Sequence, residues 1–237
     1  MHYHLALVAL EDKQPQEAEN RLRRAAEAGH ADAMDRLALL LNETDRASEA
    51  EEWCRRAVQA SDAPGAMTSL GIVLYQSGRN DEAEYWWTRA AESAETTAMF
   101  NLGGLASVTG RTEMAEKWYR RAAEAGFTDA MLDLGYLLNE AGRPREAEQW
   151  YRRGAESGHI RCMVNLGVMM ARAGILAEAE RWWRRAADAG DAKAMLGLSK
   201  LMLSRGRKGG AAWWRQRAAE AAEAVEAAEK TDRAGGQ

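Results

Sequence analysis

The stretch EAEQWYRR at residues 146–153 decides the fold of this chain, because versions of it occur seven times along the sequence. The alanine at its second position recurs every 32 or 33 residues. These alanines are Ala18, Ala50, Ala83, Ala115, Ala147, Ala179 and Ala211. A fixed period of this size indicates a solenoid, in which each repeat buries its apolar side against its neighbours. The 237 residues therefore predict one elongated stack rather than separate globular domains.

The first half of each repeat has the pattern of an amphipathic α-helix, which we call helix A. Met131, Leu134, Gly135 and Leu138 are spaced at i, i+3, i+4 and i+7, so they share one helix face. A small residue follows the leucine in each repeat, and we expect it to let a neighbouring helix approach closely. Glycines such as Gly142 end this helix, since a left-handed cap residue costs least there.

The second half of each repeat predicts another helix, helix B. Ala147, Trp150, Tyr151 and Gly154 again share one face. The tryptophan pairs at 86–87, 182–183 and 213–214 are interpreted as core residues of this helix rather than as a surface that stacks sugars or bases. Helices of about a dozen residues are marginal alone, so stacked neighbours must stabilise them. The predicted fold class is all-α, a right-handed α-solenoid of about seven helix-turn-helix repeats.

The predicted solenoid covers residues 1–222. Its repeats span about 1–30, 31–63, 64–95, 96–127, 128–159, 160–191 and 192–222. Residues 223–237 are expected to extend the last helix as a polar cap and then to fray into a tail.

The charge balance favours neither nucleic acid nor an anionic membrane as partner. The chain has 32 basic and 36 acidic residues, a net charge of -4. No signal peptide or membrane-spanning segment is found in the sequence, so a cytoplasmic protein is expected. Cys54 and Cys162 lie in different repeats at apolar positions, which predicts reduced cysteines that fill the core.

The Arg-Arg pairs of helix B are predicted to lie on a solvated face rather than to contact nucleic acid. Glutamates stand four residues before arginines, in the orientation that stabilises a helix. The pairs are Glu19 and Arg23, Glu51 and Arg55, Glu116 and Arg120, Glu148 and Arg152, and Glu180 and Arg184. Each exposed pair is worth only a few tenths of a kcal/mol.

The order of residues within one repeat resembles that of a tetratricopeptide repeat over about residues 1–222. The matching positions are Leu134, Gly135, Leu138, Gly142, Ala147, Tyr151 and Gly154. The exit from helix B at 122–126 and the aromatic pairs at 118–119 and 150–151 look more like Sel1-like repeats. The repeat is shorter than either pattern. The resemblance implies a solenoid whose A helices line a concave groove, and a non-enzymatic adaptor that binds peptides or protein segments.

The candidate partner-binding residues lie on the A helices. In related repeat proteins an asparagine just before the core leucine holds an extended peptide, and Asn101 and Asn165 match it here. An amide suits this task because it donates and accepts at once; a solvated polar residue is the alternative. Aromatic residues at nominally exposed positions predict contact anchors. The preferred residues are Asn101, Asn165, Phe100, Tyr136, Tyr75, Asp133, Asn139, Arg161 and Lys200. The further expected groove positions are Asp32, Asp35, Leu39, Asn42, Thr68, Ile72, Leu132, Val164, Val168 and Lys193.

No catalytic, cofactor or metal motif is recognised in the sequence. The four histidines have no metal-ligand spacing beyond His2 and His4, an i,i+2 pair that would not share a helix face. No phosphate-binding glycine loop or nucleophile elbow occurs. We expect a partner of mixed charge, a protein or extended peptide. Two alternatives remain, a self-assembling structural solenoid, which would make the chain a homo-oligomer, and a sensor arm of a larger signalling protein.

Overall fold

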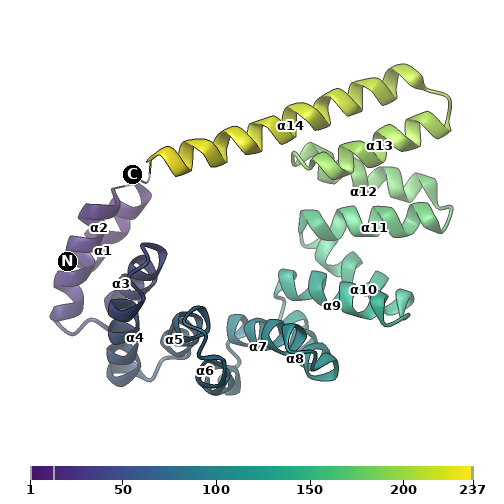
Figure 1. Ribbon diagram of the computed structural model, residues 1–237. Coiled ribbons are helices and arrows are strands. Elements are labelled where there is room, and N and C mark those ends of the chain that lie inside the picture. The colour runs from purple at the N-terminus through teal and green to yellow at the C-terminus, as the bar shows by residue number, and fades with distance from the viewer. Residues whose placement is uncertain (1, 13, 236–237) are drawn as a thin grey trace. The chain divides into compact units, whose positions relative to one another are not determined.

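A computed structural model describes residues 2–12 and 14–235, which form fourteen helices and no strand (Figure 1). The helices are α1 (His2–Glu11), α2 (Pro15–Glu27), α3 (Ala31–Glu43), α4 (Ala47–Ser61), α5 (Pro64–Gln76), α6 (Asn80–Glu92), α7 (Thr96–Val108), α8 (Thr112–Glu124), α9 (Thr128–Glu140), α10 (Pro144–Glu156), α11 (Ile160–Arg172), α12 (Leu176–Asp188), α13 (Ala192–Ser204) and α14 (Lys208–Gly235). This confirms the all-α fold of seven helix-turn-helix repeats, with the odd-numbered helices as A helices and the even-numbered helices as B helices.

The helices form two compact units. One contains α1–α8 and ends at Ala125, and the other begins at Gly126 and contains α9–α14. Within a unit, each A helix packs against the B helix that follows it, and each B helix packs against the next A helix. The solenoid pattern predicted from the sequence is therefore present inside each unit.

Glycine ends the A helices as predicted. Gly142 has a φ of 73°, and its N–H donates to the carbonyl of Asn139 at 3.1 Å. The next amide, that of Arg143, donates to the carbonyl of Leu138 at 2.9 Å. These two bonds satisfy carbonyls that the helix end leaves free, which fixes the sharp turn into helix B.

The small residue on helix A makes room for a ring from helix B of the same repeat. A Cβ built on Gly167 would lie 2.5 Å from Nε1 of Trp183, and one on Gly135 would lie 2.6 Å from Cε1 of Tyr151. Neither distance is possible between real atoms, so only glycine admits the ring. The Trp183 indole N–H also donates to the carbonyl of Val164 at 3.3 Å, which satisfies its buried polar group.

The two arginines of each Arg-Arg pair have different partners. All five predicted glutamate–arginine pairs are confirmed at 2.5–3.0 Å. On the helices that carry a tryptophan three residues before it, the second arginine lies over that ring: the guanidinium of Arg153 is 4.5 Å from the ring centre of Trp150, and that of Arg185 is 4.9 Å from Trp182. On these helices both arginines are therefore engaged within the repeat rather than free for a ligand.

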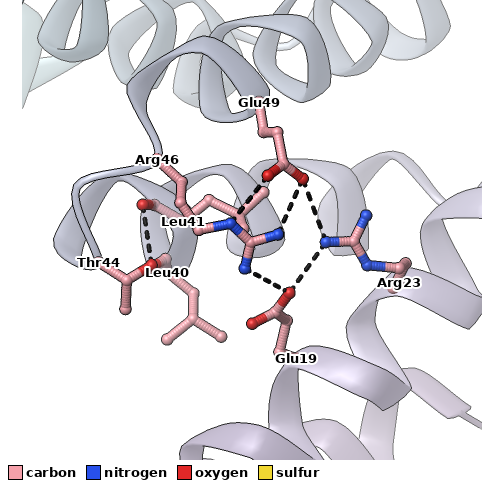
Figure 2. Close-up of polar contacts among 7 residues, drawn as sticks. All are labelled: Glu19, Arg23, Leu40, Leu41, Thr44, Arg46 and Glu49. Carbon is pink, nitrogen blue, oxygen red and sulfur yellow. Dashed lines mark hydrogen bonds and ion pairs between the residues drawn. The ribbon is translucent and has the colours of Figure 1, made fainter. Parts of the chain in front are cut away.

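Charged side chains also connect successive repeats, which the sequence analysis did not predict. Arg46 of repeat two lies 2.8 Å from Glu19 of repeat one and 2.8 Å from Glu49 of its own repeat, and Arg23 is 3.4 Å from Glu49 (Figure 2). The four side chains thus form a closed ring of alternating charge. All are partly exposed, so this ring adds little to the free energy of unfolding.

The interpretation of the last tryptophan pair is wrong for Trp213. Its side chain is 51% exposed, whereas Trp182 of the preceding repeat is 2% exposed. Trp213 stands two residues after the repeat alanine, Ala211, but Trp182 stands three residues after its own alanine. The shift of one residue turns Trp213 by about 100° around the helix and out of the core.

Helix α14 is more than twice as long as the other B helices of its unit and continues past the end of α13 (Figure 1). It runs to Gly235, and Gly236 and Gln237 of the expected frayed tail lie outside the described residues.

The two cysteines, Cys54 on α4 and Cys162 on α11, are free and buried, as expected from the sequence. Burial raises the pKa of both thiols, that of Cys162 to about 12.

Candidate functional site

Side-chain caps fix where α11 and α13 begin. Nδ1 of His159 accepts the backbone N–H of Cys162 at 3.2 Å, and its Nε2 lies 3.0 Å from Asp129, so the proton of a neutral ring is on Nε2. Asp191 accepts the N–H of Ala194 at 2.7 Å. These caps satisfy helix-end donors and so stabilise the first turns of the two helices.

The residue before the core leucine packs on the ring of the preceding repeat. A Cβ on Gly197 would lie 2.8 Å from the ring of Trp183. One repeat earlier, the pair is Asn165 and Tyr151: burial raises the pKa of Tyr151 to about 12, and a hydrogen bond with Asn165 opposes that rise. Asn165 therefore has a structural partner as well as a place on the A-helix face.

In the first unit, Tyr75, Phe100 and Asn101 lie on α5 and α7. The ring of Tyr75 is 5.7 Å from that of Trp87, and the ring of half-buried Phe100 is 5.7 Å from that of Tyr119. Nδ2 of Asn101 is buried and has no hydrogen-bond partner among the described residues. The two aromatic residues thus contribute to packing, while Asn101 has an amide group that the fold does not use.

In the second unit, the predicted residues lie on three A helices. Asp133, Tyr136 and Asn139 are on α9, Arg161 and Asn165 on α11, and Lys200 on α13. Tyr136 is 61% exposed. Burial raises the pKa of Asp133, and the charge of nearby Arg161 opposes the rise. Asn139 lies with Arg172 and the first turn of α10, so the structure does not bring it together with Asn165.

A hollow of about 630 Å³ lies between α11 and α13, and we call it the α11–α13 hollow. It brings together two of the predicted site residues, Asn165 and Lys200. It is lined by Val164, Asn165, Val168, Ala171, Arg172, Trp183, Lys193, Leu196, Gly197 and Lys200. Sequence reasoning missed Trp183 and Leu196 here. Trp183 was assigned wholly to the core. Leu196 occupies the same repeat position as Phe100 and Val164, so the signal was present but was not extended to the last repeat.

A second hollow of about 490 Å³ shares Val164, Asn165 and Lys193 with the first, and we call it the α14 hollow. Ala221, Ala222 and Val225 of α14 form one wall, and the remaining lining residues are Arg161, Gly190, Asp191 and Ala192. The sequence contained a signal for this wall. Ala218, Ala222 and Val225 continue one helix face past the end of the last repeat.

The basic residues of these hollows form no ion pair with any residue that the structure describes. Arg161, Arg172, Lys193 and Lys200 are exposed, and within the described part of the chain none of them forms an ion pair. By contrast, Arg184 on the adjacent α12 is paired with Glu180 at 2.5 Å. The A-helix face of the second unit therefore has positive charge that the fold leaves available to a ligand.

The described residues contain no cluster of three or more His, Cys, Asp or Glu side chains that could hold a metal ion. Among the same residues, no helix is both long and apolar enough to cross a membrane.

Sequence models of a known family match most of the repeats. A sequence model described as Tetratricopeptide repeat matches residues 3–66 and 68–127, and a second one with the same description matches residues 129–153 and 160–185. No curated protein sequence matches the chain.

Solved structures with a similar fold cover most of the chain. A Sel1 repeat protein from Oxalobacter formigenes is 28% identical, with a TM-score of 0.71 over 92% of this chain and 99% of that one. The antigen c5321 of uropathogenic Escherichia coli strains, which displays an SLR fold, is 26% identical, with a TM-score of 0.70 over 92% of this chain and 53% of that one. Pseudomonas aeruginosa pilF is similar in fold, at 16% identity and a TM-score of 0.65 over 78% of this chain and 88% of that one.

Proposed function

Because this chain belongs to the tetratricopeptide repeat family, we propose that it is a non-enzymatic scaffold that binds a polypeptide segment on the face of its A helices. Repeats of this kind generally mediate protein interactions. The observation that carries the proposal is the α11–α13 hollow, which contains Asn165, Lys200 and the further groove residues Val164, Val168 and Lys193. Concave sites with apolar walls and a few polar groups are where ligands usually bind.

The dimensions of α11 suit a short extended segment. Its 13 residues give a helix of about 20 Å, which matches about six residues of extended polypeptide. A segment lying along α11 would pass Asn165, whose amide can hydrogen-bond a peptide group. In the first unit, the unpartnered Nδ2 of Asn101 supports the same use of that position. Tyr75, Phe100, Asp133, Tyr136, Asn139 and Arg161 remain proposed contacts on the A-helix faces of their own units.

The proposed site of action is the reducing cytoplasm, which the free, buried cysteines support. We do not adopt the self-assembly and sensor-arm alternatives, because no feature of the described residues specifically favours them.

The test uses two leucines on one helix. Leu196 is 43% exposed and lines the α11–α13 hollow, and Leu203, also on α13, is 45% exposed and does not line it. Peptides are selected from a displayed random library against the wild-type protein. We expect Leu196→Gln to weaken binding of the selected peptides at least about tenfold, since a buried leucine contact is worth roughly 1.5–3 kcal/mol, and Leu203→Gln to leave it unchanged.

Equal unfolding curves for both variants would show that the fold is intact. Selected peptides that bind Leu196→Gln as tightly as wild type would contradict the proposal, as would a library that yields no binding peptide.

A further inference from the structure

We infer that the α11–α13 hollow and the adjoining α14 hollow select an acidic segment, and this inference rests on the proposed function. The segment is an extended peptide in which carboxylates flank a bulky apolar side chain. The partner class follows from the order of side chains along the two helices and from the absence of ionic partners for the basic ones in the described chain.

On α11 the relevant residues occur in the order basic, apolar, basic. Arg161 lies in the first turn, Val164 and Val168 follow on the same side, and Arg172 ends the helix. Eleven residues separate the two arginines, a distance of about 16 Å along the axis. Carboxylates about five residues apart in an extended peptide would reach both arginines at once.

On α13 the same order recurs over a shorter distance. Lys193 lies in the first turn, Leu196 follows, and Lys200 comes one turn later. The two helices therefore present their apolar residues opposite each other, with Trp183 between them where Gly197 has no side chain. A leucine or phenylalanine side chain of the partner fits this apolar centre.

Acidic residues around the hollows do not neutralise the basic ones. None of the described residues that line the α11–α13 hollow is acidic. Asp191 lines the α14 hollow, but its Oδ1 is used to cap α13. Asp133 lies near Arg161 without forming an ion pair, and burial raises its pKa. Four basic residues thus face one capping carboxylate across the two hollows.

The net charge of the whole chain makes this inference easy to distinguish from general attraction. At -4, the protein as a whole attracts basic peptides. Local recognition by the hollow predicts the opposite preference. It also predicts a dependence on salt, because exposed charges are screened within about 10 Å at 0.1 M salt.

The experiment compares three hexapeptides with a neutral fluorophore, Glu-Asp-Leu-Phe-Asp-Glu, its neutral analogue Gln-Asn-Leu-Phe-Asn-Gln, and Lys-Lys-Leu-Phe-Lys-Lys, by fluorescence anisotropy with the full chain. We expect the acidic peptide to bind at least about tenfold more tightly than the neutral one at low salt. The basic peptide should bind most weakly. The advantage of the acidic peptide should shrink at about 0.5 M salt.

Matched variants locate the effect. Arg172→Gln with Lys200→Gln removes two charges from the hollow, and Arg181→Gln with Arg184→Gln removes two from α12, outside it. The first pair should abolish the preference for the acidic peptide while the neutral peptide binds as before. The second pair should leave the preference intact.

Three outcomes would overturn the inference. Equal binding of the three peptides, or preference for the basic one, would do so while leaving the proposed function standing, since a peptide still binds. Binding of none of them would overturn the inference, and the library selection would decide the proposed function separately. Displacement of the acidic peptide by an oligo(dT) strand at a lower concentration than by the unlabelled peptide would assign the charge to nucleic acid instead.

Discussion

Helices α11 and α12 belong to one repeat, and both carry arginines and large apolar side chains, yet the two helices differ in what those side chains contact. On α12, Arg184 pairs with Glu180, and Arg185 covers Trp182. On α11, Arg161 and Arg172 form no ion pair within the described residues and border a hollow. Composition alone therefore does not identify a binding surface, and the presence or absence of intramolecular partners does.

The largest expected effect is a loss of stability when a buried side chain of α12 is removed. Trp183→Ala removes the ring that fills the space over Gly167, and the resulting cavity should lower the free energy of unfolding by roughly 3–5 kcal/mol. Urea denaturation followed by circular dichroism measures the loss. A decrease of less than about 1 kcal/mol would mean that the ring contributes little to the stack.

The next largest effect comes from the other half of this contact. Gly167→Ala places a Cβ within 2.5 Å of Trp183, and we expect a loss of about 1–3 kcal/mol from overpacking. Gly104→Ala in α7 is the control, because its Cβ meets only the Tyr119 hydroxyl, at 3.8 Å. That variant should gain roughly 0.5–1 kcal/mol, since alanine favours a helix.

The contact between Gly167 and Trp183 can also be tested in a variant that lacks the ring. Repeat two has Ala38 at the glycine position and Cys54 at the ring position, and both are buried. Once Trp183→Cys has removed the ring, adding Gly167→Ala should therefore cost little, and a double-mutant cycle measures the difference. Additive losses would contradict direct contact as the cause.

A smaller effect is expected at the ion pairs of the B helices. Burial raises the pKa of Glu51, but hydrogen bonds from Arg55 and Arg79 outweigh it and hold the pKa below its ordinary value of 4.5. Because the folded-state pKa is the lower one, this stabilisation is complete above the unfolded pKa and is lost as the pH falls through the folded value. Arg79→Gln should flatten the acid limb of stability measured between about pH 5 and pH 3. An unchanged acid limb would show that Arg79 does not stabilise ionised Glu51.

The smallest effect on stability is expected on the α11 side. Arg172→Gln with Lys200→Gln breaks no ion pair among the described residues, so the free energy of unfolding should change by less than about 0.5 kcal/mol. Thermal or urea unfolding checks this. A clear loss would mean that the two side chains stabilise the repeat and are not held available for a partner.

The sequence predicted the parts of the fold that depend on local spacing. The helix pairs, the glycine that ends an A helix at Gly142 and the pair of Glu148 with Arg152 all follow from residues within one turn or one repeat. It did not predict the bond from Arg46 to Glu19, because those residues are 27 positions apart and the contact depends on side-chain rotamers. The exposure of Trp213 could have been predicted from its position relative to Ala211.

The candidate site was predicted less completely than the fold. Asn165, Arg161 and Lys200 lie around the two hollows because their position on helix A fixed their direction. Asn139 is not among them because it is on α9, beside the first turn of α10, whereas the α11–α13 hollow is formed one repeat later. The wall formed by Val225 depends on how far α14 extends past α13, which no single repeat specifies.

Amide hydrogen exchange with and without the acidic hexapeptide tests most directly the claim that the two helices of a repeat have separate roles. The account predicts slower exchange in α11 and α13 and little change in α12, since α12 borders the hollow only through the side chain of Trp183. Protection that falls on α12, or binding without protection of α11 and α13, would contradict it.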